Sequence, residues 1–353
     1  MIELLNSNYQ PLKTASNNFS DVFFDLFVYR ADSTRIASGY VSEESIADLI
    51  NLFNTGYKKP LSLIVGMHYF EGFTYGQYYA LQKLSKILNS KKLGGIFIST
   101  HMKYHGKVYS FREKDNFCSI IGSSNLTKIS LTKENIAERV YDTDLFIHNE
   151  KITGDIDKFI TDLQNKFCTN FKDINIDDFK IVEPTNIFED FLGVEKVSED
   201  KRKLIMDSLT KVRFEIEIKP EEKSHLNCYF GEGRKNFGNG IILPRPWYEA
   251  EVIASKRIWS SPNYPKEKEF KVVTDDGYEF LCKTSGSNFK NFRSASDLKI
   301  LGRWLKGRME NKKVLKVGEK VTAETFAKYK RNRMSLIKTS IPDTWYLDFG
   351  VKK

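Results

Sequence analysis

Two short groups of polar residues in the first half of the chain have the side-chain types needed for phosphoryl transfer. His105 and Lys107 flank one glycine, and the run Gly122-Ser123-Ser124-Asn125 follows further along the chain; we expect each group at the end of a strand. An imidazole can attack a phosphodiester phosphorus and form a phosphohistidine, which splits one difficult displacement into two easier ones. Lysine and asparagine can hold the non-bridging oxygens and stabilise charge in the five-coordinate transition state. These residues predict phosphodiester chemistry that needs no metal.

Together the two groups resemble the H-x-K … G-S-x-N signature of the phospholipase D superfamily. The resemblance implies that the catalytic residues include His105, Lys107, Ser123 and Asn125. One position departs from the pattern, because Arg112 stands where the superfamily has an aspartate.

A nuclease branch of the superfamily lacks that aspartate and has a downstream N-x-E stretch instead. The corresponding stretch here, Asn135-Ile136-Ala137-Glu138, contains one extra residue. We expect Glu138 to hydrogen-bond the nucleophilic imidazole and fix its tautomer. Glu134 is the alternative, because the insertion leaves the register open. In a purely structural interpretation both are exposed carboxylates at a helix end.

The reaction of this superfamily uses two histidines, one as nucleophile and one as general acid, but the chain carries one copy of the motif. We therefore predict a homodimer whose N-terminal domains bring two His105 side chains to one site. His101 is expected to support the site or line its pocket, and His68 to be structural or to border the cleft. Two further histidines, His148 and His225, have no catalytic context.

The elements that would position these residues alternate between strands and helices. Alternation of this kind favours an α/β domain with a covered, mixed sheet. Ser42 and Ser45 offer N-cap chemistry for the first helix. The expected strands are 35–41, 61–66, 95–99, 107–111 and 117–121, and the expected helices are 42–53, 75–89 and 155–167. We predict a phospholipase D-like domain over 1–170 and a linker over 171–200, with a short helix at 187–192.

The second half, predicted as one domain over 201–353, has a different texture. After a helix at 198–212, short strand-like pieces at 214–218, 248–255, 268–274, 278–284 and 345–349 are interrupted by one helix at 295–310. This pattern is typical of a small barrel or open β-structure. Trp247, Trp304 and Trp345 lie amid apolar periodicity and are expected in its core.

Charge separates the two halves as well. The whole chain has a net charge of +9, but residues 201–353 hold 33 Lys and Arg against 19 Asp and Glu. Their excess of +14 would support many phosphate contacts, and the affinity for a nucleic acid bound in this way would fall steeply with salt. The basic partner-binding surface is therefore expected in the C-terminal half.

The strings RPWYEAEVIASK, GRWLKGRME and WYLDFG, with the motif upstream, resemble the NgoFVII-type restriction endonucleases and, more distantly, BfiI. The resemblance implies a metal-independent nuclease domain joined to a mainly β pseudobarrel that extends two arms into the major groove of double-stranded DNA. Two loops rich in forked donors and acceptors would read bases, although such loops are often only hairpin turns. The expected DNA-binding residues are Arg234, Lys235, Asn236, Asn239, Ser287, Asn288, Lys290, Asn291 and Arg293. Arg331 and Arg333 are expected to contact backbone phosphate.

These observations predict a type II-like restriction endonuclease that needs no cofactor. The alternatives are a lipid phosphodiesterase or transferase of the phospholipase D type and a catalytically silent DNA-binding module. The family resemblance allows a separate helicase-like ATPase partner. The chain itself lacks a G-x-x-x-x-G-K-[ST] phosphate loop and is not expected to be that ATPase. With no apolar run of membrane-spanning length and no signal-peptide pattern, we expect a cytoplasmic protein without membrane contacts. The four cysteines lack zinc-site spacing, and we expect no metal.

Overall fold

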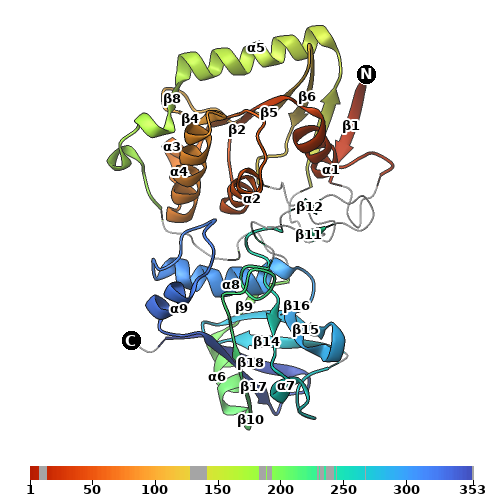
Figure 1. Ribbon diagram of the computed structural model, residues 1–353, viewed down its shortest axis with the longest axis vertical. Helices are drawn as coiled ribbons and strands as arrows, with labels where there is room; N and C mark the ends of the chain where they lie inside the picture. The colour runs from red at the N-terminus through yellow and green to blue at the C-terminus, as the bar shows by residue number, and fades with distance from the viewer. Residues whose placement is uncertain are drawn as a thin grey trace. The chain divides into compact units, whose positions relative to one another are not determined.

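The computed structural model describes residues 1–7, 14–127, 141–182, 188, 193–228, 230, 234–235, 242–243, 245–266 and 268–351. The described residues up to 182 form one compact unit, the N-terminal unit, and those from 188 onward form a second, the C-terminal unit (Figure 1). No helix in these parts of the chain is both long enough and apolar enough to cross a membrane.

The N-terminal unit is an α/β structure on a mixed sheet, as predicted. Within the described residues the sheet has eight strands in the order β1-β7-β6-β5-β2-β3-β4-β8. β2, β3 and β4 pair in parallel, and the other neighbours pair antiparallel. The strands are β1 (Ile2–Asn6), β2 (Ser33–Ser38), β3 (Leu61–Val65), β4 (Gly94–Ser99), β5 (Lys107–Glu113), β6 (Asn116–Gly122), β7 (Thr143–Ile147) and β8 (Cys168–Asn170).

Helices cover both faces of this sheet. They are α1 (Phe19–Phe24), a π-helical turn (Asp25–Arg30), α2 (Glu43–Asn54), α3 (His68–Glu71), α4 (Tyr75–Ser90), α5 (Glu150–Phe167) and two 3-10 turns (Phe171–Asp173 and Ile176–Asp178). Figure 1 shows α5 along one face, with α1, α2 and α4 on the other. Ile156 and Ile160 of α5 pack in one cluster with Val108 of β5. At the start of α2, the Ser42 side chain accepts a hydrogen bond from the Ser45 backbone N–H, which confirms the expected N-cap.

The C-terminal unit is mainly β, also as predicted. Its main sheet follows the order β10-β17-β18-β14-β15-β16-β13, with β9 paired to β15, and β11 and β12 form a separate pair. The strands are β9 (Glu195–Lys196), β10 (Leu209–Glu217), β11 (Arg234–Lys235), β12 (Ile242–Leu243), β13 (Val252–Ile253), β14 (Glu269–Thr274), β15 (Tyr278–Ser285), β16 (Asn291–Ser294), β17 (Arg333–Thr339) and β18 (Thr344–Asp348). The helices are α6 (Glu199–Asp207), α7 (Lys256–Trp259), a 3-10 turn (Ser287–Phe289), α8 (Leu298–Asn311) and α9 (Ala323–Tyr329). The three tryptophans expected in this core are buried, at 1%, 0% and 5% exposure.

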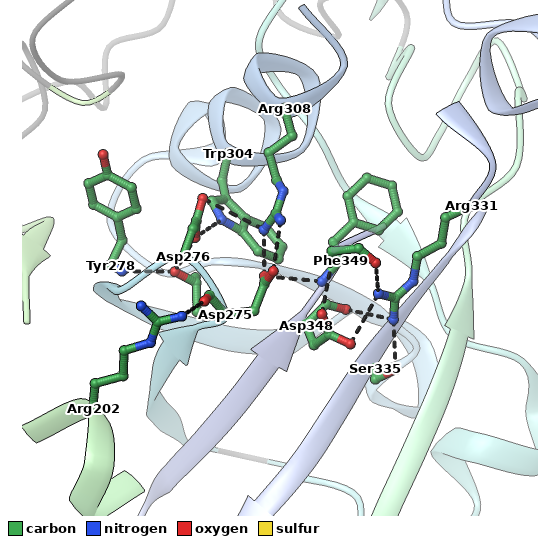
Figure 2. Close-up of polar contacts among 12 residues, drawn as sticks. Arg202, Asp275, Asp276, Tyr278, Trp304, Arg308, Arg331, Ser335, Asp348 and Phe349 are labelled. Carbon is green, nitrogen blue, oxygen red and sulfur yellow. Dashed lines mark hydrogen bonds and ion pairs between the residues drawn. The ribbon is translucent and has the colours of Figure 1, made fainter. Parts of the chain in front are cut away.

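A polar network joins α8 to the turn that follows β14 (Figure 2). The Arg308 guanidinium bonds both carboxylate oxygens of Asp275, one of them at 2.7 Å, and Trp304 Nε1 donates to Asp276 at 2.9 Å. The backbone N–H of Phe349, just after β18, donates to Asp275 at 3.2 Å. Because these charges are largely out of water, their mutual pairing is what makes their burial tolerable.

Arg331 belongs to a second part of this network, also drawn in Figure 2. Its guanidinium donates to the Asp348 carboxylate at 3.0 Å and to Ser335 Oγ at 2.9 Å. The expected phosphate contact of Arg331 is therefore not supported, since its donors already have partners inside the unit. Arg333 is exposed.

Several predicted elements of the C-terminal half were wrong in extent, including the strand predicted over 214–218, which belongs to the longer β10. The helix predicted over 198–212 ends at Asp207, because Leu209 already pairs with Thr339 of β17. The strand predicted over 248–255 is reduced to β13, because Ala250 N–H donates to the Leu298 carbonyl at the start of α8 instead of to a strand. The helix predicted at 187–192 falls outside the described residues apart from residue 188.

Lys306 of α8 is fully buried and gives a test of stability against pH. Its ammonium donates to the Trp247 carbonyl and lies 4.5 Å from the Trp247 ring centroid. Burial lowers its pKa from 10.5 to about 7. Between pH 7 and 10 the unfolded chain therefore binds a proton that the folded chain does not, so raising the pH stabilises the fold.

We expect Lys306→Met to remove this dependence. From pH 7 to 9 the free energy of unfolding of the wild type should rise relative to the variant by about 1.4 kcal/mol per pH unit at most. Urea unfolding of both proteins across that range measures the difference. A constant difference would mean that Lys306 stays charged in the folded protein.

Candidate active site

The residues of the sequence motif meet at one edge of the N-terminal sheet. In the antiparallel register, Lys107 at the start of β5 pairs with Ser38 at the end of β2, and Val108 pairs with Ile121 near the end of β6. His105 was expected at a strand end, but it lies before the start of β5, separated from it by Gly106. Since β5 runs opposite to β2 and β6, its start and their ends lie at the same edge.

His105 and Lys107 are in direct contact. Lys107 Nζ lies 3.2 Å from His105 Nε2 and donates to the His105 carbonyl at 2.8 Å. An ammonium group can only donate, so in this arrangement Nε2 accepts and the ring proton is on Nδ1. The His105 side chain is exposed, whereas partial burial lowers the pKa of Lys107 and the nearby charge of Asp142 opposes that shift. An exposed imidazole thus stands beside a cation that could hold a phosphate oxygen.

Asn125 lies at the same edge, just beyond the end of β6. Its Oδ1 accepts a hydrogen bond of 3.2 Å from the backbone N–H of Tyr40. This bond assigns the orientation of the amide and directs the Nδ2 donors away from the Tyr40 backbone. The Tyr40 ring in turn packs edge-on to the His105 imidazole, with 5.6 Å between the centroids. Tyr40 therefore links the amide and the imidazole.

The two serines of the motif are held by carboxylates at the start of β7. Ser123 is exposed, and its hydroxyl donates to Asp142 Oδ1 at 2.7 Å. Asp144 is 1% exposed and accepts from both the Ser124 backbone N–H at 3.0 Å and the Ser124 hydroxyl at 2.6 Å. Burial raises the pKa of Asp144, and the two Ser124 hydrogen bonds partly offset that rise. These bonds fix the turn that carries Asn125.

Tyr40, Asp142 and Asp144 were not among the residues predicted from the sequence. The two aspartates flank Thr143 at the start of an apolar strand, and this alternation of polar residues next to a strand was the available signal. Tyr40 had none, because its role depends on two partners that are far away in the chain.

The other two histidines near this edge have backbone partners. His68 is buried, its Nε2 accepts from the Val41 N–H at 3.1 Å, and its Nδ1 lies 3.0 Å from the Gly72 carbonyl oxygen. Burial lowers the pKa of His68, so a neutral structural role fits it. His101 is exposed, with Nδ1 3.4 Å from the Phe167 carbonyl oxygen and 2.9 Å from Thr100 Oγ1. The predicted carboxylate Glu138 and its alternative Glu134 lie outside the described residues.

Gly66 at the end of β3 permits a close backbone approach beside the site. A Cβ at this position would lie 1.9 Å from the carbonyl oxygen of Tyr104, the residue before His105. We expect Gly66→Ala to lower the free energy of unfolding by about 1–3 kcal/mol, because backbone would have to move. Gly154→Ala in α5 is the control, since its Cβ would meet no atom of the described residues within 4 Å. Urea unfolding compares the two, and equal stabilities would contradict the close approach.

In the C-terminal unit, part of one predicted DNA-binding loop is exposed. Ser287, Asn288 and Lys290 are exposed in the connection between β15 and β16. Asn291 is half-buried and donates to Glu251. Arg293 is half-buried, and its Nε atom is out of water without a hydrogen-bond partner among the residues that the structure describes.

The structure describes residues 234 and 235 of the other predicted loop. Arg234 and Lys235 form β11, paired with β12. Asn236 and Asn239 lie outside the described residues. The described residues also contain no group of three or more His, Cys, Asp or Glu side chains placed to hold a metal ion.

Two family models match the chain. A model of the NgoFVII restriction endonuclease N-terminal PLD domain matches residues 17–176, and a model of the NgoFVII C-terminal B3-like DNA-binding domain matches residues 204–340. Comparison with curated proteins finds no match.

Several solved structures are similar to part of the chain. Nuc, a phospholipase D family member from Salmonella typhimurium, is 14% identical, covers 48% of this chain and 97% of its own, and has a TM-score of 0.33. NucT from Helicobacter pylori is 13% identical, covers 48% and 99%, and has a TM-score of 0.32. Polyphosphate kinase from Porphyromonas gingivalis is 15% identical, covers 59% and 30%, and has a TM-score of 0.33. At such TM-scores the two family models, not these structures, carry the assignment.

Proposed function

Because the chain belongs to the NgoFVII restriction endonuclease family, with both family domains matched, we propose that it cuts double-stranded DNA at a specific sequence through attack of His105 on phosphorus. Membership makes it a phospholipase D superfamily endonuclease. One observation supports the finer proposal above all others: Lys107 Nζ lies 3.2 Å from His105 Nε2, in an arrangement that places the lone pair of the ring on this nitrogen.

The proposed reaction has two displacements. In the first, His105 Nε2 forms a bond to phosphorus, one P–O ester bond breaks, and the leaving oxygen takes a proton from a second imidazole. In the second, water attacks phosphorus, the P–N bond breaks, and that second imidazole takes up the water proton. The Lys107 ammonium and the Asn125 amide hold the non-bridging oxygens in both transition states. Ser123 supports this site by fixing Asp142 at the start of β7.

The second imidazole comes from a second copy of the chain in this proposal. The sequence holds a single H-x-K … G-S-x-N motif, so a homodimer through the N-terminal units supplies the general acid as the partner copy of His105. The ring proton on Nδ1 then needs an acceptor, and we assign that role to Glu138, with Glu134 as its alternative. A separate helicase-like ATPase remains compatible with this scheme.

Cleavage of plasmid DNA in the presence of EDTA tests the proposed function. We expect discrete fragments with identical ends, because amine and amide groups do the work of divalent ions. Cleavage that vanishes in EDTA and returns with magnesium would contradict the mechanism. An intact plasmid together with headgroup release from phosphatidylcholine vesicles would replace the function with the lipid-cleaving alternative.

Asn288 offers a separate test of sequence reading. Its φ of +60° is left-handed, which glycine adopts without strain, so Asn288→Gly removes the side chain without distorting the turn. We expect a loss of about 1–3 kcal/mol in binding to the cognate sequence and little change for unrelated DNA. Gel-shift titrations of both DNAs measure this, with exposed Asn263→Gly as the control. Equal losses on both DNAs would mean that Asn288 does not read bases.

A further inference from the structure

Tyr40 is placed between the two groups that the proposed reaction needs most. It follows Ser38 and Gly39 at the end of β2, and its half-buried ring packs edge-on to His105 with 5.6 Å between centroids at 81°. Its backbone N–H bonds the Asn125 amide oxygen at 3.2 Å. One residue thus contacts the nucleophile with its side chain and the phosphate-holding amide with its main chain.

The neighbouring glycine makes this proximity possible. A Cβ on Gly39 would lie 3.2 Å from His105 Cα and 3.3 Å from His105 Cδ2. The Gly39 N–H also donates to the Gly106 carbonyl at 2.9 Å, which ties the end of β2 to the motif on the other side of His105. The backbone before Tyr40 therefore lies close to His105 because Gly39 has no Cβ and because its N–H is bonded to Gly106.

The ring of Tyr40 is itself fixed from behind. Its hydroxyl donates to Glu71 Oε2 of α3 at 2.7 Å, and its ring packs edge-on to His68 with 5.4 Å between centroids. The hydrogen bond to Glu71 raises the pKa of Tyr40 to about 12, so the phenol stays protonated and keeps donating through the neutral range. Because its hydroxyl donates its hydrogen bond to Glu71, the phenol acts on the site through packing.

We propose that Tyr40 is a positioning residue that holds the His105 imidazole and the Asn125 amide in one fixed arrangement, and that Glu71 acts through Tyr40 by tethering its hydroxyl. This inference rests on the proposed function of His105. An error of about 1 Å in the placement of a nucleophile can cost roughly a hundredfold in rate, so the tether should affect turnover more than DNA binding.

Four variants test the role of the tether. Tyr40→Ala removes the ring and keeps the backbone N–H that binds Asn125; we expect kcat to fall about 10- to 100-fold, with KM for DNA within about threefold. Tyr40→Phe keeps the ring packing and should retain more activity than Tyr40→Ala. Glu71→Gln keeps an acceptor for the phenol and should resemble the wild type, whereas Glu71→Ala should match Tyr40→Phe. Tyr29→Ala, which removes an exposed tyrosine packed on Phe24, is the control and should leave kcat unchanged.

A double-mutant cycle decides whether Glu71 acts through Tyr40. Glu71→Ala should lower kcat in the wild-type background and have no further effect in the Tyr40→Phe background, because the hydrogen bond is already absent there. Additive losses would overturn the tether. Wild-type kcat in Tyr40→Ala would overturn the positioning role, and so would a loss confined to KM.

The outcomes also separate this inference from the proposed function. If the wild type cuts DNA, His105→Ala is inactive and the Tyr40 variants behave as the wild type, only the positioning role fails. If His105→Ala still cuts, the proposed nucleophile fails whatever the Tyr40 variants do. Should Tyr40→Ala not fold, as judged by thermal unfolding, the Tyr40→Phe and Glu71→Ala cycle decides alone.

Discussion

His105→Ala should abolish DNA cleavage and leave DNA binding intact. We expect the cleavage rate to fall by at least about three orders of magnitude, since loss of a nucleophile leaves only the binding and electrostatic contributions. Binding should persist, because the model of the B3-like DNA-binding domain matches residues 204–340, away from the motif. Plasmid cleavage measures the first effect and gel-shift titration the second.

His148→Ala is the matched control for this variant. His148 is an exposed histidine with no catalytic context, and its backbone N–H donates to the Met1 carbonyl at 2.9 Å. It should cut at the wild-type rate. Quenching a wild-type reaction in alkali should also trap a DNA–protein adduct that acid removes, as expected of a P–N bond, and His105→Ala should give none. Cleavage by His105→Ala would remove the proposed nucleophile altogether.

Lys107→Met should have the next largest effect. The ammonium is the cation that the structure places at His105 Nε2, and it is the proposed partner of a non-bridging oxygen. Removing such a preorganised donor commonly costs about 100- to 1000-fold in kcat. We expect that loss in single-turnover cleavage, with the affinity for DNA within about threefold.

Lys103→Met separates this local role from the general attraction of DNA to positive charge. Lys103 is exposed and lies in the loop before β5, four residues earlier than Lys107. Its loss should weaken binding slightly at low salt and leave kcat unchanged. If Lys107→Met lost only affinity, and lost it as Lys103→Met does, Lys107 would be a phosphate-attracting surface residue and not part of the catalytic site.

The sequence alone was enough to predict the class of chemistry and the broad architecture. The types and spacing of His105, Lys107 and Asn125 indicate phosphoryl transfer because few side chains can perform each step. Alternation of helical and strand periodicity in the first half, and short strands in the second, was enough for both fold classes, because each pattern depends on near neighbours in the chain. The three core tryptophans followed from the same local periodicity.

Only the tertiary structure decided which residues surround this chemistry. Tyr40 meets Asn125, and Asp144 meets Ser124, through pairings between strands that lie far apart in the chain, and no local pattern encodes that register. Arg331 has a basic sequence context suited to phosphate, yet Asp348 on a neighbouring strand binds it. The physical reason is the same in each case: a side chain's partner is set by the sheet edge it reaches, which depends on contacts distant in sequence.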